Sequence, residues 1–145
     1  MIVDFNNIKY TNDAISTLFQ CDNLESLIFK NIDTSNIKHM NSMFANYEKL
    51  KSLDLSMFNT SNVIDMSYMF YNSSKLSVLN LTNFNTEKVT NMQNMFCECK
   101  HIKILDLSSF NTSNVTIISC MFYNCKSLYT INFGKNFDCY KNPDL

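Results

Sequence analysis

The amino-acid sequence of 145 residues predicts an α/β repeat solenoid, in which each 26-residue repeat contributes one parallel strand and one short helix. Three observations support this fold class. A similar segment recurs at constant spacing, its first part alternates apolar and polar residues, and its second part has apolar residues at helical spacing. The recurrence is clear in "LDLSMFNTSNVIDMSYMFYNSSKL", which begins at Leu53, and in "LDLSSFNTSNVTIISCMFYNCKSL", which begins at Leu105.

The copies follow one another without insertions or deletions. Their heading residues are 26 positions apart and are Leu24, Leu50, Leu76, Ile102 and Leu128. Other apolar columns keep the same spacing, and one of them contains Phe44, Phe70, Phe96 and Phe122. A single copy buries too few apolar side chains to offset the conformational entropy lost when its residues become ordered. We therefore expect the copies to stack and to share one core.

Each copy divides into a strand, a corner, a helix and a return loop. Leu53, Asp54 and Leu55 alternate in polarity, which is typical of a half-buried strand. Beyond a Phe-Asn-Thr corner, the apolar spacing becomes that of one helix face, with Val63, Met66, Met69 and Phe70. Ser61 and Asn62 precede this run, where helix N-cap residues would lie.

We expect three parts along the chain. Residues 1–23 form a degenerate N-terminal repeat or cap, residues 24–133 form the repeat array, and residues 134–145 form a C-terminal cap or tail. Val3, Phe5 and Ile8 repeat the spacing of the strand columns, but this N-terminal repeat, ahead of the copy that begins at Leu24, is shortened. The chain therefore either begins with a cap or is a piece of a longer array.

The pattern Leu50-x-x-Leu53-x-Leu55 matches the opening of a leucine-rich repeat. Phe58 departs from the commonest form of that repeat, which has Asn or Cys at this position. With "MFYNC" ahead of the next Leu, as in residues 121–125, the repeats resemble the BspA-like family. More narrowly, they resemble the "FNTSNVTNMSYMF" repeats of mycoplasma-type and other bacterial surface proteins, a domain of unknown function. The resemblance implies a leucine-rich-repeat horseshoe, a surface or adhesion setting and no catalytic residues.

Composition excludes several classes of protein. Lys and Arg total 12 against 13 Asp and Glu, so the net charge of -1 lacks the basic footprint of a nucleic-acid binder. The sequence has neither an apolar run of roughly 20 residues nor a signal peptide at its start. We therefore expect no nucleic-acid partner and no membrane insertion by this chain. Localisation stays open: the resemblance implies a surface or secreted protein, and a true start at Met1 would imply a cytoplasmic one.

The cysteines favour packing over chemistry. Cys21, Cys99 and Cys125 share a repeat column with Tyr47 and Ser73, which predicts buried free thiols. The alternatives are a disulfide between Cys99 and Cys125 or between Cys120 and Cys125. The cysteine spacing does not match a structural zinc site.

We expect no catalytic, cofactor-binding or metal-binding residues, and hence no enzyme. His39 and His101 occupy different repeat positions, so they cannot form a facing pair. Asp54 and Asp106 share a strand column, with Asn80 between them, which favours an outward polar ladder over an acid–base pair.

The sequence instead predicts a non-enzymatic binding module that presents its strand face to a protein or glycan partner. The expected binding residues are the outward strand positions: Ser52, Asp54, Ser56, Val78, Asn80, Thr82, Ile104, Asp106 and Ser108. Val78 and Ile104 would form an apolar centre, whereas Lys38 and His39 would lie on the outer, helical side. The alternative is an intracellular scaffold or effector module of the same fold.

Overall fold

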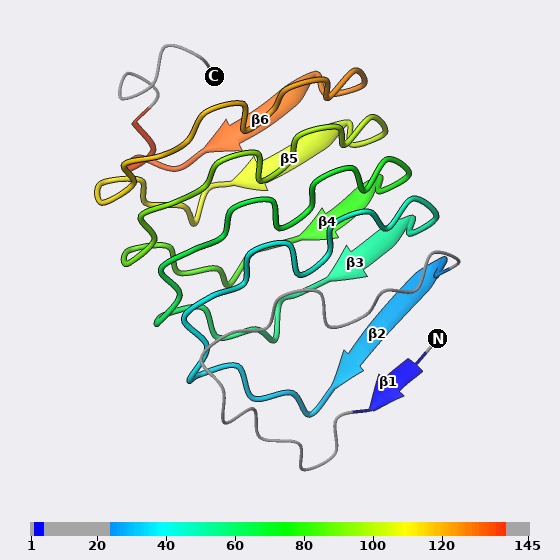
Figure 1. Ribbon diagram of the computed structural model, residues 1–145, viewed down its shortest axis with the longest axis horizontal. Helices are drawn as coiled ribbons and strands as arrows, with labels where there is room; N and C mark the ends of the chain where they lie inside the picture. Colours follow the sequence, from blue (N-terminus) through cyan, green and yellow to red (C-terminus); the bar gives the residue numbers. More distant parts are fainter. Residues whose placement is uncertain (1, 5–23, 139–145) are drawn as a thin grey trace.

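The computed structural model describes residues 2–4 and 24–138 as a stack of 26-residue copies (Figure 1). The strands of this part of the chain are β1 (Ile2–Asp4), β2 (Ser26–Lys30), β3 (Ser52–Asp54), β4 (Val78–Asn80), β5 (Ile104–Leu107) and β6 (Thr130–Phe133). Within each sheet, neighbouring strands pair in parallel and in the repeat register, so that Ser52 pairs with Val78 and Leu53 with Leu79. The predicted parallel strand at the head of each copy is confirmed. Phe5, Ile8 and Cys21, for which the sequence also gave predictions, lie outside the described residues.

The predicted helix is wrong. None of the described residues is helical, so the chain is not an α/β solenoid or a leucine-rich-repeat horseshoe with one helix per repeat. In place of the expected helix from Val63 to Phe70, the chain has an isolated bridge at Asp65 and turns from Ser67 onward, in which the Tyr71 N–H donates to the Tyr68 carbonyl at 3.0 Å. Tyr68 and Asn72 have positive φ values of 58° and 53°, which a right-handed helix does not allow.

These left-handed residues recur with the repeat. One column of positive φ contains Ser42, Tyr68, Asn94 and Cys120, and a second contains Asn46, Asn72, Glu98 and Asn124. Asn is the commonest residue in these two columns, and it adopts the left-handed region more readily than most side chains. Each copy therefore bends back to its next strand without using glycine.

The backbone N–H groups explain why turns replace the helix. The Met66 N–H donates to the Asn91 carbonyl of the next copy at 3.0 Å, and the Phe70 N–H donates to the Met95 carbonyl at 2.9 Å. A helix would direct the same donors to carbonyls four residues earlier in its own chain. A short helix that is rich in Asp, Ser, Tyr and Asn would gain little stability from intrinsic helix propensity. Hydrogen bonding between copies is therefore favoured over the helix.

The core consists of the repeat columns. The rings of Phe44, Phe70, Phe96 and Phe122 stack face to face, with centroids 5.4–5.8 Å apart between neighbouring copies. A second pair, Phe84 and Phe110, stacks at 6.2 Å. The ring of Phe122 is partly buried, and the other five are fully buried. The predicted aromatic column is therefore confirmed, although it packs against turns rather than a helix.

Buried threonines join the copies at the Phe-Asn-Thr corner. The Thr86 hydroxyl donates to the Asn111 carbonyl at 2.9 Å and accepts a hydrogen bond from the Asn111 N–H at 2.8 Å. Thr34 and Thr60 make the same reciprocal pair with the following copy. The threonine column therefore satisfies backbone groups that the corner would otherwise leave buried and unpaired.

The strands form two sheets in the described part of the chain. One has the order β1-β2-β3-β4 and the other contains β5 and β6 (Figure 1). Hydrogen bonds away from the strands still connect the third and fourth copies, including Met92 N–H to Ile117 carbonyl at 2.7 Å and Phe96 N–H to Met121 carbonyl at 3.0 Å. The stack is thus continuous across the boundary between β4 and β5.

Candidate binding surface on the strand face

The predicted binding positions all lie at the surface of the strand face. Val78 is 62% exposed and Ile104 is 53% exposed, and they lie at the two sides of the boundary between the sheets. Ser56 and Asn80 are half-buried, and the other positions are exposed: Ser52, Asp54, Thr82, Asp106 and Ser108. The structure therefore places exposed apolar side chains among polar ones, as the repeat columns predicted.

The polar members bond mostly within their own turns. Asp54 Oδ1 accepts the Ser56 N–H at 2.9 Å. Asn80 Oδ1 accepts the Thr82 hydroxyl at 2.9 Å and the Thr82 N–H at 3.2 Å. β3 and β4 end at these Asx turns, which satisfy the first N–H groups beyond the strand. Asp54 and Asn80 therefore stabilise the turns that follow their strands, whereas the apolar side chains of Val78 and Ile104 cannot accept such hydrogen bonds.

Asp106 makes the same turn in the fourth copy. Its Oδ1 accepts the Ser108 N–H at 2.9 Å. Hydrogen bonds from the Ser108 side chain and then from its backbone N–H lower the pKa of Asp106. These hydrogen bonds therefore favour the ionised form of the carboxyl group.

The side chains that could bind a metal ion are dispersed over the described part of the chain. Among the described residues, no three His, Cys, Asp or Glu side chains lie close enough together to hold a metal ion. His39 pairs with Asp65 in a second ladder of isolated bridges that continues to Asn91 and Ile117, away from the strands. Lys38 is exposed beside it. These two residues thus lie outside the strand face, as predicted, but beside the second ladder and not on a helix.

The cysteine column is a packing and hydrogen-bonding column. Cys99 is fully buried and its thiol donates to the Phe70 carbonyl at 3.1 Å, while Cys125 is half-buried and donates to the Phe96 carbonyl at 3.0 Å. Ser73 uses its hydroxyl in the same way, toward the Phe44 carbonyl at 2.6 Å. A thiol and a hydroxyl can therefore replace each other in this column.

The cysteines of the described region are free thiols, so neither the Cys99–Cys125 nor the Cys120–Cys125 disulfide is present. Burial raises the pKa of Cys99, and it raises the pKa of Cys125 to about 11. Both thiols are therefore protonated and poorly nucleophilic at neutral pH. The predicted buried free thiol is confirmed at Cys99 and holds in part at Cys125.

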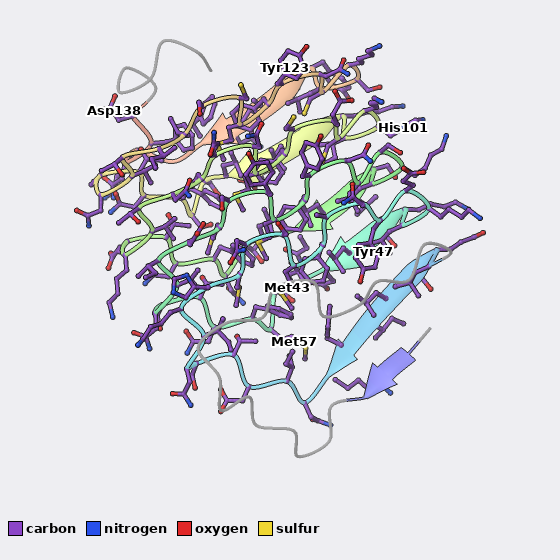
Figure 2. All side chains as sticks on the ribbon, viewed as in Figure 1. Met43, Tyr47, Met57, His101, Tyr123 and Asp138 are labelled. Carbon is purple, nitrogen blue, oxygen red and sulfur yellow. The ribbon has the colours of Figure 1, made fainter. Side chains whose placement is uncertain are left out.

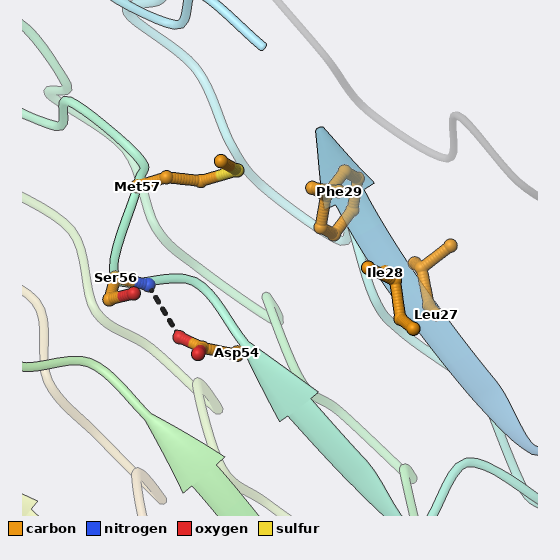
Figure 3. A pocket seen from close by; sticks show the side chains of 6 residues that line it. All are labelled: Leu27, Ile28, Phe29, Asp54, Ser56 and Met57. Atoms are coloured by element: carbon orange, nitrogen blue, oxygen red, sulfur yellow. Dashed lines mark hydrogen bonds between the residues drawn. The ribbon is translucent and has the colours of Figure 1, made fainter. Parts of the chain in front are cut away.

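A hollow that the sequence reasoning missed opens between β2 and β3 (Figure 3). It has a volume of about 140 Å³ and is lined by Leu27, Ile28, Phe29, Asp54, Ser56 and Met57. Ile28 is 49% exposed and Met57 is 47% exposed, whereas Leu27 and Phe29 belong to the buried core. Two residues of the buried core therefore line a hollow that is open at the strand face.

The first cause of the hollow is Ile28. It occupies the repeat position at which later copies have Asp54, Asn80 and Asp106, and it cannot accept the hydrogen bond that forms an Asx turn. β2 runs on to Lys30, where it pairs with β1, while β3 ends at Asp54, and the pairing of β2 with β3 stops at Leu27 and Leu53. Beyond that pair, the two copies are joined again at the corner, where the Asn59 N–H donates to the Thr34 hydroxyl at 2.8 Å.

The second cause is Met57. Its column contains Asn83 and Ser109 in later copies, and both donate side-chain hydrogen bonds to the preceding copy, to Ser56 at 2.6 Å and to Leu81 at 3.3 Å. Met57 has no such donor. Two apolar residues thus stand at neighbouring positions where the repeat has polar ones, and that paired departure was the sequence signal for the hollow.

Comparisons with known proteins identify a family. Neither a curated protein nor a solved structure matches the chain. In the part of the chain that the structure describes, no helix could cross a membrane. The model of the family described as "Mycoplasma protein of unknown function, DUF285" matches residues 54–140, more than half of the sequence. The chain therefore belongs to this mycoplasma-type family.

Proposed function

We propose that the chain is a non-enzymatic binding module that engages a protein partner through its strand face, in adhesion or another protein–protein interaction. The observation that carries this proposal is the exposure of Val78 and Ile104 amid polar residues. An apolar centre with a polar rim is the usual anatomy of a protein-binding patch. The resemblance of the repeats to BspA-like surface proteins supports a cell-surface setting.

The second candidate is an intracellular scaffold or effector module that uses the same face. The free thiols of Cys97, Cys99, Cys120 and Cys125 support it, because disulfides are rare in reducing compartments. Both candidates assign the same surface, and cell fractionation with an antibody against the chain separates them.

Exchanging both Val78 and Ile104 for Lys should weaken partner binding by about tenfold or more, because it places two charges in the centre of the patch. We expect the fold to survive, since both side chains point outward. The measurement is binding of the labelled protein to immobilised host-cell surface proteins and, separately, to a glycan array.

The matched control is Ile117→Lys. Ile117 is 44% exposed and lies on the second ladder, away from the strands. Changes at Lys38 and His39 provide further controls on that side. If binding responds to Ile117, Lys38 or His39 and ignores Val78 and Ile104, the strand face is not the binding surface. Binding that is confined to the glycan array would contradict a protein partner.

A further inference from the structure

We propose that the hollow between β2 and β3 receives one aliphatic side chain of Leu or Met type from the partner protein, with a Lys or Arg beside it that pairs with Asp54. This inference rests on the proposed function and names the chemistry that the strand face recognises. Figure 3 shows the residues that line the hollow.

The size of the hollow indicates a single side chain. A volume of about 140 Å³ is well below the roughly 300–1,000 Å³ of pockets for small-molecule ligands. Its mouth is formed by Ile28 and Met57, and the buried side chains of Leu27 and Phe29 lie behind them. An aliphatic group that entered would remove apolar surface of these residues from water.

The charge at the rim selects the neighbouring residue of the ligand. Asp54 Oδ1 accepts the Ser56 N–H at 2.9 Å, but a carboxylate has about four acceptor sites on its two oxygens. Among residues 2–4 and 24–138, no salt bridge involves Asp54. A Lys or Arg next to the aliphatic residue would complete the hydrogen bonding of this carboxylate.

The repeat columns indicate that the hollow belongs to one place in the stack. The strand column has Asp or Asn at positions 54, 80, 106 and 132, and the corner column has Asn or Ser at positions 31, 83 and 109. Between residues 24 and 133, only Ile28 and Met57 replace these polar residues with apolar ones, and they line the same hollow. Both are about half exposed, so neither substitution serves the core alone.

A protein ligand fits this chemistry better than a glycan. Sugar hydroxyls need several polar partners, and the lining has only one carboxylate and one hydroxyl group, from Asp54 and Ser56. The side chain of Met57 also adapts its shape to different aliphatic groups, since it is unbranched and flexible.

Methyl NMR spectra of the whole chain test the proposal directly. The probes are three synthetic peptides, GSLKSG, GSAKSG and GSLESG. We expect GSLKSG to shift the methyl resonances of Ile28 and Met57 in a saturable manner, and the other two peptides to bind about tenfold more weakly. Asp54→Asn should abolish the preference for Lys over Glu and should retain the preference for Leu over Ala.

The double variant Ile28→Asn and Met57→Asn is the matched control, because it restores the polar residues of the repeat columns. It should reduce GSLKSG binding about tenfold or more. Equal binding to this variant, or no saturable shift up to about 1 mM peptide, would overturn the proposal. A shift of the same methyls by N-acetylglucosamine but not by GSLKSG would overturn it as well. If the Lys variants at Val78 and Ile104 still lose partner binding in that case, the proposed function stands and only the assignment of the hollow fails.

Discussion

Replacing Phe96 with Ala should lower the free energy of unfolding by about 3–5 kcal/mol. The Phe96 ring is fully buried and lies between the rings of Phe70 and Phe122, at centroid distances of 5.4 and 5.8 Å and interplanar angles of 7°. Its removal leaves a cavity in the shared core of three copies, and the stacked neighbours lose their partner on one side. Equilibrium denaturation in urea measures the change.

Tyr123→Ala is the control for Phe96. Tyr123 is 64% exposed and lies near β6, at the opposite end of the stack from Met57 (Figure 2). Its replacement should change the free energy of unfolding by no more than about 0.5 kcal/mol. A loss below about 1 kcal/mol for Phe96→Ala would place that ring outside the core and would contradict the aromatic column.

Replacing Thr86 with Val should cost about 1–3 kcal/mol of unfolding free energy, although Val has nearly the same shape. The buried Thr86 hydroxyl both donates to the Asn111 carbonyl and accepts from the Asn111 N–H. Val leaves these two backbone groups without their partner at a buried corner. The loss should appear in urea denaturation as a lower midpoint with an unchanged slope.

The control for Thr86 is Thr116→Val. Thr116 is exposed, and its hydroxyl makes one hydrogen bond, of 3.1 Å, to the Thr90 carbonyl. Water can replace that bond, so the change in unfolding free energy should be small. Equal effects of the two substitutions would show that the reciprocal pair at the corner contributes nothing beyond a surface hydrogen bond.

The sequence was sufficient for the strands and the core because both depend on the repeat period. A constant spacing fixed the register of β3 on β4, as the pairing of Leu53 with Leu79 shows. The same spacing predicted the Phe70 and Phe96 stack. Identical copies that stack in register must place identical residues side by side, whatever the local backbone conformation.

The sequence was insufficient for the second half of each copy. Val63, Met66, Met69 and Phe70 are all buried, as a helix would require, but a series of turns buries the same spacing. The choice between a helix and a non-helical backbone depends on where the N–H groups donate. The Met66 and Phe70 N–H groups donate to the next copy. The periodicity of apolar residues does not indicate whether these N–H groups donate within a copy or between copies. Asn at positions 46, 72 and 124 was a hint, since Asn tolerates positive φ.

The candidate surface was predicted in part. Strand alternation was enough to place Val78 and Ile104 outward. The hollow at Ile28 and Met57 required knowledge of two hydrogen bonds: Asp54 accepts one within its own turn, and Asn83 donates one to the preceding copy. The structural effect of replacing these polar residues with apolar ones can be derived only when these hydrogen bonds are known.

Backbone chemical shifts of the folded protein test the central claim most directly, which is that each copy closes through left-handed residues and not through a helix. For the second copy, we expect shifts that give positive φ at Tyr68 and Asn72 and no continuous helical values between Val63 and Phe70. Continuous helical shifts from Val63 to Phe70, with negative φ at Tyr68, would contradict the account.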